Sequence, residues 1–271
     1  MYVFYICSKS GRCYQIVIEA VFFDLDGTLL PMDMDEFLGQ YFRALTYKFS
    51  KIVPPGLMKE SILHATSAMI RDKNPAQTNQ EVFMEHFLPK VRSTSQDLLP
   101  VFNYFYGHEY KDLKAYARPN PTAKEVVDKL AGCGYRLVLA TNPIFPKEAI
   151  LERMRWAGVE SAPWELITSY EECHFCKPNP LYFDEILSKM RLSGEQALMV
   201  GNDTEADLIA SSLGIKTYLA TDNLVDRGNS PWKPDFRGKL AELPACLENL
   251  QIYPAKSMVL NPAAPLRQRR K

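Results

Sequence analysis

The sequence predicts an α/β fold, in which a parallel sheet with helices on both faces carries an inserted block of helices. The first observation is an isolated apolar run, residues 21–23, which is typical of a buried strand. The second is the alternation of apolar runs with helical spacing from Arg118 onward, which is typical of a parallel sheet with helical crossovers. The third is helical spacing alone over residues 33–116. We therefore expect one sheet built from segments on either side of a helical insertion.

These changes of pattern also predict the domain limits. The segment at the C-terminal end is rich in Pro, Ala and Arg, and we expect it to be disordered. The predicted limits are 1–19 for an N-terminal extension, 20–32 and 117–252 for the α/β core, 33–116 for the helical domain and 253–271 for the tail.

The composition is that of an ordinary globular chain. Of its 271 residues 46% are hydrophobic and 24% charged, and 32 basic residues balance 32 acidic ones. The zero net charge gives no reason to expect nucleic acid or a membrane surface as a partner. No apolar run approaches the ~20 residues of a membrane-spanning helix. Six scattered cysteines and no signal-peptide pattern favour a cytoplasmic protein, which we expect to be a monomer or a homodimer.

Residues 20–30, with the sequence AVFFDLDGTLL, are the stretch around which the chain is organised. They predict a buried strand that ends in a turn at Gly27. Residues 14–18 could add an edge strand ahead of it, but we favour a loosely attached extension. Side chains at positions i and i+2 of a strand project to the same side, so Asp24 and Asp26 should enter one small volume. Two carboxylates at such a short distance repel each other unless a cation or a shared proton lies between them. The pattern predicts a metal-dependent site, with one carboxylate ionised and the other able to carry a proton.

The helical insertion is expected to hold four helices. The apolar residues of the first recur about once per turn, and Pro54-Pro55-Gly56 ends it. These apolar residues are Phe37, Tyr41, Leu45 and Phe49. Three more helices are predicted over residues 57–70, 81–91 and 96–106. An aromatic cluster is more typical of the core of this block than of a ligand site; it consists of Phe102, Tyr104, Phe105 and Tyr106.

Downstream of the insertion, helices and strands alternate. Parallel sheets bind ligands at the carboxyl ends of their strands, so the polar clusters that follow the strands are the candidates for a site. Strands are predicted over residues 135–140, 166–169, 197–200 and 216–220. Helices are predicted over residues 121–130, 146–156, 181–190, 205–213 and 240–250.

Three polar clusters stand at such places. Thr141-Asn142 closes the strand at 135–140, and Lys177 precedes a proline that opens a helix. Gly201-Asn202-Asp203-Thr204-Glu205-Ala206-Asp207 follows the strand at 197–200. Each residue alone is more typical of a turn, a solvated side chain or a helix N-cap. Their shared place at strand ends is what predicts a site.

Together with Asp24-Leu25-Asp26-Gly27-Thr28, these clusters resemble the four motifs of the haloacid dehalogenase-like hydrolase superfamily, over about residues 20–250. The resemblance implies a Rossmann-like core whose catalytic cleft is covered by a small helical cap, the insertion at 33–116. It also implies hydrolysis of the phosphate ester of a small phosphorylated metabolite through an aspartyl-phosphate.

The resemblance further implies catalytic roles. Asp24 would be the nucleophile, and Asp26 the general acid toward the leaving oxygen and then the general base for water. Thr141 and Asn142 would hydrogen-bond the phosphoryl oxygens. Lys177 would place a positive charge where negative charge builds.

Mg²⁺ is the cofactor that the resemblance implies. Its ligands would be the Asp24 carboxylate, the backbone carbonyl of Asp26 and Asp203, with waters completing the octahedron. Asp207 would be a neighbour acting through a ligand or a water. Many relatives place the first acid of this motif directly after the glycine, where the chain has Asn202. We expect Asp203 to take over, and the amide oxygen of Asn202 is the alternative ligand.

Other activities fit the same scaffold. A phosphosugar mutase is chemically close, and a non-catalytic binder of phosphorylated ligands would keep the site without turnover. A 2-haloacid dehalogenase would share Asp24 but would need neither Asp26 nor a metal, so it is disfavoured. A phosphonatase would need a Schiff-base lysine from the cap, for which the candidates are Lys48, Lys51, Lys59 and Lys73.

Two cysteines stand directly before the motif lysine. Cys173 and Cys176 form a CxxC pair, and Cys176 is the neighbour of Lys177. A nearby ammonium can lower the pKa of a thiol and raise its reactivity. We therefore predict that oxidation of the pair lowers activity, with two unreactive thiols as the alternative.

Overall fold

A computed structural model describes residues 5–7, 13–15 and 17–249. Within these residues, six strands form one sheet in the order β5-β4-β3-β6-β7-β8, and every neighbouring pair is parallel. The predicted α/β class with a parallel sheet is confirmed, and β3 lies inside the sheet although the helical insertion separates it from β4 in sequence. The strands are β3 (Ala20–Phe23), β4 (Arg136–Leu139), β5 (Trp164–Ile167), β6 (Ala197–Gly201), β7 (Lys216–Ala220) and β8 (Phe236–Gly238).

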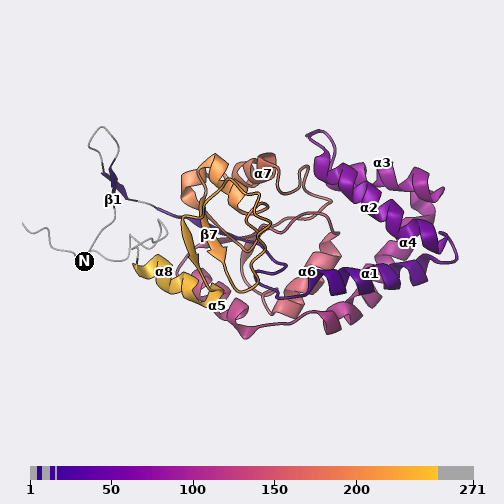
Figure 1. The fold of residues 1–271 in the computed structure, drawn as a ribbon, viewed down its shortest axis with the longest axis horizontal. Helices are drawn as coiled ribbons and strands as arrows, with labels where there is room; N and C mark the ends of the chain where they lie inside the picture. Colours follow the sequence, from indigo (N-terminus) through magenta and orange to yellow (C-terminus); the bar gives the residue numbers. More distant parts are fainter. Residues whose placement is uncertain (1–4, 8–12, 16, 250–271) are drawn as a thin grey trace, which may run out of the picture.

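Helices cover both faces of the sheet (Figure 1). Successive residues of a strand point to opposite faces, so Val21 and Phe23 enter one apolar core while Ala20 and Phe22 enter another. Helices α5, α6 and α8 pack on the first core, and α7 and η4 pack on the second. Their bounds are α5 (Pro121–Gly132), α6 (Lys147–Ala157), α7 (Pro180–Met190), the 3-10 helix η4 (Leu208–Leu213) and α8 (Leu243–Asn249).

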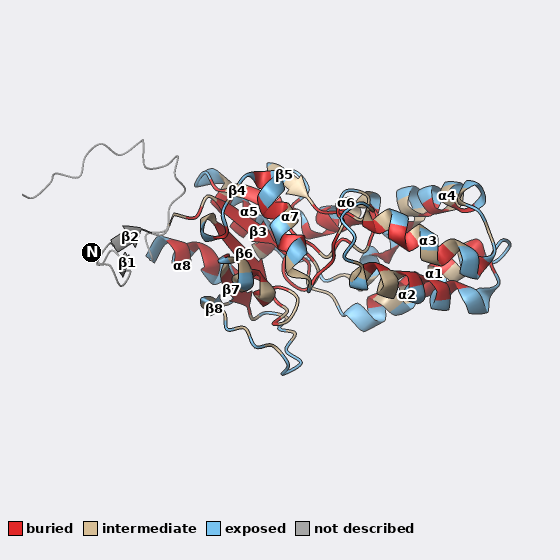
Figure 2. Ribbon diagram, turned by 90° about the horizontal axis from the view of Figure 1, so that it is seen from above, coloured by how far each residue is buried: buried red, intermediate tan, exposed pale blue. Residues whose placement is uncertain are grey.

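Between β3 and β4 the chain forms a block of helices beyond one end of the sheet (Figures 1 and 2). We refer to this block, residues 34–116, as the cap. It contains the four predicted helices and two irregular turns after them. They are α1 (Met34–Phe49), α2 (Pro55–Arg71), α3 (Asn79–Val91), α4 (Ser95–Tyr104), the π-helix η1 (Phe105–Glu109) and the 3-10 helix η2 (Tyr110–Tyr116).

Local sequence explains where the cap helices begin. The Asp33 carboxylate accepts hydrogen bonds from two free N–H groups at the start of α1. Thr78 and Glu81 form a reciprocal capping box at the start of α3, and Pro55 occupies the first turn of α2. The predicted apolar stripe of α1 is buried at every position: Phe37, Tyr41, Leu45 and Phe49.

Some elements differ from the prediction. The segment predicted as a helix over 205–213 is a loop followed by the short η4, because carboxylates take over the local backbone hydrogen bonds. Asp203 accepts from the N–H groups of Glu205 and Ala206, and Asp207 accepts from the N–H of Asp203. The sheet also gains β8, which the prediction missed because the strand has only three residues and is not a buried apolar run.

At the chain ends, β1 (Tyr5–Cys7) pairs antiparallel with β2 (Cys13–Gln15) in a separate small sheet. The alternative of an edge strand over residues 14–18 is therefore wrong, because residues 14–15 belong to β2 and residues 17–19 lead directly into β3. The expectation of disorder over residues 253–271 lies outside the described residues. No helix in the described part of the chain has the length and hydropathy that are needed to cross a membrane.

Candidate active site

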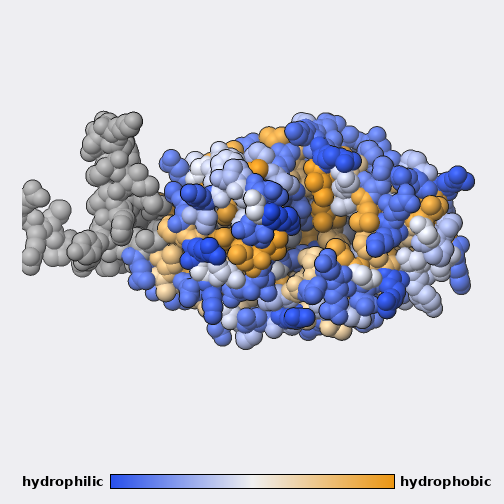
Figure 3. All heavy atoms as spheres, viewed as in Figure 1, coloured by the Kyte–Doolittle hydropathy of each residue, from blue (hydrophilic) through white to orange (hydrophobic). Residues whose placement is uncertain are grey.

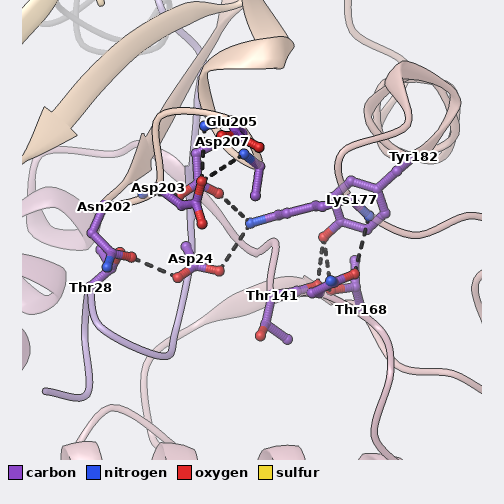
Figure 4. Close-up of polar contacts among 12 residues, drawn as sticks. Asp24, Thr28, Thr141, Thr168, Lys177, Tyr182, Asn202, Asp203, Glu205 and Asp207 are labelled. Atoms are coloured by element: carbon purple, nitrogen blue, oxygen red, sulfur yellow. Dashed lines mark hydrogen bonds and ion pairs between the residues drawn. The ribbon is translucent and has the colours of Figure 1, made fainter. Parts of the chain in front are cut away.

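The predicted site residues gather where β3, β4 and β6 end (Figure 4). These strands are in register, because Phe23 pairs with Leu139 on one side and with Val200 on the other. Residues that follow the strands therefore emerge at the same edge of the sheet. A cavity of about 420 Å³ opens there, and we refer to it as the catalytic cavity. Its lining includes all the predicted site residues: Asp24, Asp26, Thr141, Asn142, Lys177, Asp203 and Asp207.

The Lys177 ammonium lies between two carboxylates. Its Nζ atom is 2.9 Å from Oδ1 of Asp24 and 2.6 Å from Oδ1 of Asp207, and only 2% of the residue is exposed. Burial lowers the pKa of Lys177, but the Asp207 and Asp24 carboxylates outweigh burial and leave the pKa above its ordinary value. Lys177 is therefore a fixed positive charge beside Asp24.

Asp24 is a buried carboxyl in a crowded acidic environment. The pKa of Asp24 is raised to about 7. Burial is the largest cause, the neighbouring Asp207 and Asp26 carboxylates add to the rise, and Lys177 opposes it. Its Oδ2 atom accepts a 3.3 Å hydrogen bond from the Thr28 hydroxyl. The group is therefore ionised above about pH 7, and a cation in the cavity would extend the ionised range downward.

Contacts between the end of β4 and the start of α7 set the position of Lys177. The Lys177 backbone N–H donates to Oδ1 of Asn142 at 3.1 Å. The carbonyl of Thr141 accepts from the hydroxyls of Tyr182 and Thr168, each at 2.8 Å. The Asn142 oxygen is thus engaged within the protein, and its NH₂ group is the part that can donate to a ligand.

Asp26 has a partner that the sequence reasoning missed, Arg153 on α6. Nη1 of Arg153 is 2.5 Å from Oδ2 of Asp26, and the arginine is fully buried with its guanidinium 4.4 Å from the centre of the Phe145 ring. Burial raises the pKa of Asp26, and Arg153 and Lys177 oppose the rise without cancelling it. Oδ1 of Asp26 and Nη2 of Arg153 are both buried without a hydrogen-bond partner in the described structure.

The sequence did contain a signal for Arg153. The buried residues of α6 include Ala149 and Ala157, and Arg153 stands four positions from each, on the same apolar face. A guanidinium on such a face must find a buried anion. That anion is Asp26, whose own place was predicted from the DxD motif.

The loop after β6 places three polar side chains differently. Asn202 accepts from the Thr28 hydroxyl at 3.0 Å and donates to the carbonyl of Asn223 at 2.6 Å, so its amide is engaged at both ends. Asp203 caps the loop through Oδ1 and pairs through Oδ2 with Arg227 at 2.8 Å. Asp207 accepts from Lys177 at 2.6 Å.

Two glycines allow these loops to approach each other. Gly27 has a φ of +88°, and a Cβ atom there would lie 2.4 Å from Nδ2 of Asn202. A Cβ atom at Gly201 would lie 2.1 Å from Oδ2 of Asp207. Any larger residue at either position would push the loops apart and displace the carboxylates.

Comparison with known proteins agrees with this arrangement. The model of the haloacid dehalogenase-like hydrolase family matches residues 18–214. The chain belongs to this family. Its curated relatives include the glyceraldehyde 3-phosphate phosphatase of Methanothermobacter thermautotrophicus, which is 28% identical over 211 residues (78% of this chain and 88% of the relative). The phosphoglycolate phosphatase of Vibrio cholerae is 26% identical over 206 residues (75% and 84%).

Solved structures share the fold of this hydrolase. The HAD phosphatase from Thermococcus onnurineus aligns with a TM-score of 0.54 at 21% identity, over 85% of this chain and 98% of its own. The L-2-haloacid dehalogenase from Xanthobacter autotrophicus aligns with a TM-score of 0.53 at 15% identity, over 86% and 100%. Because both a phosphatase and a dehalogenase have this fold, the fold alone does not specify the reaction, which depends on the residues of the site.

The donor groups of the hydrolase suit a hard cation in type. Among the described residues, no group of three or more His, Cys, Asp or Glu side chains is placed to hold a metal ion. A site made of two carboxylates, one backbone carbonyl and waters needs no such group. Asp24, Asp26 and Asp203 line the cavity and supply carboxylate and carbonyl oxygens, which Mg²⁺ prefers as ligands. The residues present therefore fit Mg²⁺.

The cysteine pair of the hydrolase does not have the reactivity that its spacing suggested. Cys173 and Cys176 are buried, and burial raises the pKa of Cys173 to about 12 and that of Cys176 above its ordinary value. The ammonium of Lys177 lies against Asp24 and Asp207. The premise that Lys177 activates the thiols is wrong, because desolvation of the thiolate outweighs it.

Proposed function

We propose that this hydrolase cleaves the phosphate monoester of a small metabolite by attack of Asp24 on phosphorus. The observation that carries the proposal is the buried Lys177 ammonium 2.9 Å from the Asp24 carboxylate, in a cavity that Asp26 also lines. The site thus combines a nucleophile, a fixed positive charge and a proton donor. The two relatives named above are both phosphatases, which supports the same reaction.

The reaction divides into two displacements at phosphorus. In the first, an oxygen of Asp24 bonds to phosphorus, the bond to the ester oxygen breaks, and Asp26 gives its proton to the leaving oxygen. In the second, Asp26 takes a proton from water, the water oxygen bonds to phosphorus, and the Asp24–phosphorus bond breaks to release phosphate. Lys177, Thr141 and the NH₂ group of Asn142 face the phosphoryl oxygens as negative charge accumulates on them.

Asp26 must be protonated when the ester binds. Burial favours the neutral form, and Arg153 opposes it. The incoming phosphate brings further negative charge, which favours the neutral form of Asp26. Arg153 therefore sets how readily Asp26 releases its proton, and we assign it a positioning role through Asp26.

Mg²⁺ would be held by the Asp24 carboxylate, the backbone carbonyl of Asp26 and Asp203. It would supply positive charge against the repulsion between a carboxylate and a phosphate dianion, which is about 4 kcal/mol for each unit pair at 4 Å and an effective dielectric of 20. Both Asn202 and Asp203 are hydrogen-bonded within the protein, and we favour Asp203 as the ligand because its carboxylate carries the negative charge that suits a hard divalent cation.

The phosphonatase alternative loses its support. That reaction would need a cap lysine in the catalytic cavity, and Lys177 is the lysine that lines it among the described residues. The cap lysine Lys48 pairs instead with Glu109 at 2.5 Å. The remaining candidates, all exposed, are Lys51, Lys59 and Lys73.

The test is hydrolysis of p-nitrophenyl phosphate in the presence and absence of Mg²⁺ by the wild type and by Asp24→Asn. We expect the variant to fold and to lose turnover, and we expect acid-quenched wild type to carry a phosphoryl group on the peptide that contains Asp24. Turnover by a folded Asp24→Asn protein would contradict the nucleophile. In a parallel assay with a phosphosugar as substrate, an isomerised phosphosugar formed without release of phosphate would indicate a mutase instead.

A further inference from the structure

A second cavity lies next to the catalytic one, between the cap and the core. Its volume is about 170 Å³, and we refer to it as the apolar cavity. Leu38 of α1 and Ile144 and Phe145 of the core line both cavities, so the two spaces share a wall. Figure 3 shows hydrophobic residues around a hollow at this junction of cap and core. When the phosphate of an ester lies by Asp24, its alcohol portion would point toward the wall that the two cavities share.

None of the residues that line the apolar cavity carries a charge. Its polar groups are mostly satisfied within the protein, since the hydroxyls of Tyr41 and Tyr106 hydrogen-bond to each other at 2.6 Å and Gln80 donates to the hydroxyl of Tyr170. Burial raises the pKa of Tyr41 to about 12, so its phenol is neutral at ordinary pH. A carboxylate or phosphate in this space would lose its hydration and would find no charged side chain in the lining, since Arg153 lies against the Phe145 ring and is already paired with Asp26.

The size of the cavity limits its occupant. An apolar cavity of about 150 Å³ in another protein is large enough to hold benzene. A space of about 170 Å³ therefore accepts one six-membered ring or an alkyl chain of about six carbons. It remains partly open, because Leu63 lines it and is 48% exposed. An occupant can thus enter without unfolding of the cap.

We infer that the apolar cavity binds the alcohol portion of the substrate, and that this portion is an uncharged alkyl or aryl group of about six carbons. The inference rests on the proposed phosphatase function. It separates the expected substrate from esters with a second acidic group, such as phosphoglycolate. The predicted aromatic cluster contributes here, since Phe102 and Tyr106 line the cavity as well as packing in the cap.

The first test is kcat/KM for the straight-chain alkyl phosphates from methyl to octyl, with phosphoglycolate for comparison. Their alcohols are almost equally poor leaving groups, so chain length changes binding in the cavity and leaves the chemistry alone. We expect kcat/KM to rise about fourfold for each CH₂ that is buried, and to level off near six carbons. The kcat/KM for phosphoglycolate should be about as low as that for the shortest alkyl esters. Equal rates along the series, or a preference for phosphoglycolate, would overturn the inference and leave the phosphatase function standing.

Variants at the cavity provide the second test. Thr66→Phe fills the space and Thr66→Leu fills part of it, so each should lower the ratio of kcat/KM for hexyl over methyl phosphate, the larger side chain more. Leu63→Asp puts a charge at the mouth and should lower the same ratio. The matched control is Leu57→Asp on the same helix, 37% exposed and outside the cavity lining, which should leave the ratio unchanged.

The outcomes separate the two proposals. If no ester of any chain length is hydrolysed by the wild type, the phosphatase function itself fails. If the esters are hydrolysed but the ratio is the same in wild type, Thr66→Leu and Leu63→Asp, the cavity does not bind the substrate. Thermal melting followed by circular dichroism shows that each variant compared is folded.

Discussion

Replacing Arg153 by Met removes the charge that faces Asp26 and keeps a side chain of similar length for packing. Two unit charges about 4 Å apart attract by about 4 kcal/mol at an effective dielectric of 20, and removal of one partner from a buried pair costs on the order of 3–5 kcal/mol. Arg153 is fully buried and Asp26 is mostly so, so solvent screens this pair little. We therefore expect Arg153→Met to lose on the order of 3 kcal/mol of unfolding free energy at pH 8.

The loss should depend on pH in a defined direction. The pKa of Asp26 is raised in the folded protein, and without Arg153 it rises further, because the arginine opposes that rise. A group whose pKa is raised by folding stabilises the fold at low pH and loses that contribution as the pH passes through its folded pKa. Arg153→Met should therefore lose less stability at pH 5 than at pH 8, because lower pH favours the neutral form of Asp26, which does not need the arginine.

Urea unfolding at pH 5 and pH 8, followed by circular dichroism, measures both values. The basic limb of kcat/KM against pH should also move upward in Arg153→Met, because Asp26 keeps its proton to higher pH. The control is Arg155→Met on the same helix. The side chain of Arg155 is half-exposed and pairs with Glu152 and Glu160, so its replacement should change the free energy of unfolding by less than about 1 kcal/mol. A loss that is equal at both pH values, with an unmoved basic limb, would refute the electrostatic account and leave Arg153 as packing.

Three further expectations follow from the site. Asp203→Ala should weaken Mg²⁺ binding in a calorimetric titration more than Asn202→Ala does, and the reverse order would move the ligand to Asn202. Because burial raises the pKa of Asp24 to about 7, the metal-free wild type should lose stability relative to Asp24→Asn as the pH rises from about 4 to 7, and a flat difference in urea unfolding would contradict this. Peroxide should leave the activity of the wild type and of a Cys173→Ser/Cys176→Ser variant equally unchanged, because both thiols are buried and their pKa values are raised.

The sequence predicted the position of the site because the end of each strand can be recognised from neighbouring residues, and the sheet then brings these ends together. Asp24, Thr141 and Asp203 each stand just past an apolar run, and a parallel sheet in register brings such positions to one edge. No side-chain detail was needed for that inference. The helix stripe of α1 was predictable for the same reason, since its period alone decides which face is buried.

Other features depend on contacts between distant segments, and a local pattern can show that a residue such as Arg153 is buried without showing its partner. The pairing of Arg153 with Asp26 joins residues 127 positions apart. Asp207, in the loop that replaces the predicted helix over 205–213, contacts Lys177, which lies 30 positions earlier in the chain. Local helix propensity is a weak preference that tertiary contacts override. The three-residue β8 is defined by its pairing with β7 rather than by its own composition.

Phe145 lies between the proposed space for the substrate and the arginine that pairs with the acid. Its ring lines both the catalytic and the apolar cavity, and the guanidinium of Arg153 lies 4.4 Å from its centre. An alkyl group in the apolar cavity would exclude water from that ring, whereas the Arg153 guanidinium behind it is already fully buried. The pair between Arg153 and Asp26 is therefore little screened whether or not the cavity is filled. Phe145 thus separates the proposed space for the alcohol portion from the arginine that holds the group that must protonate it.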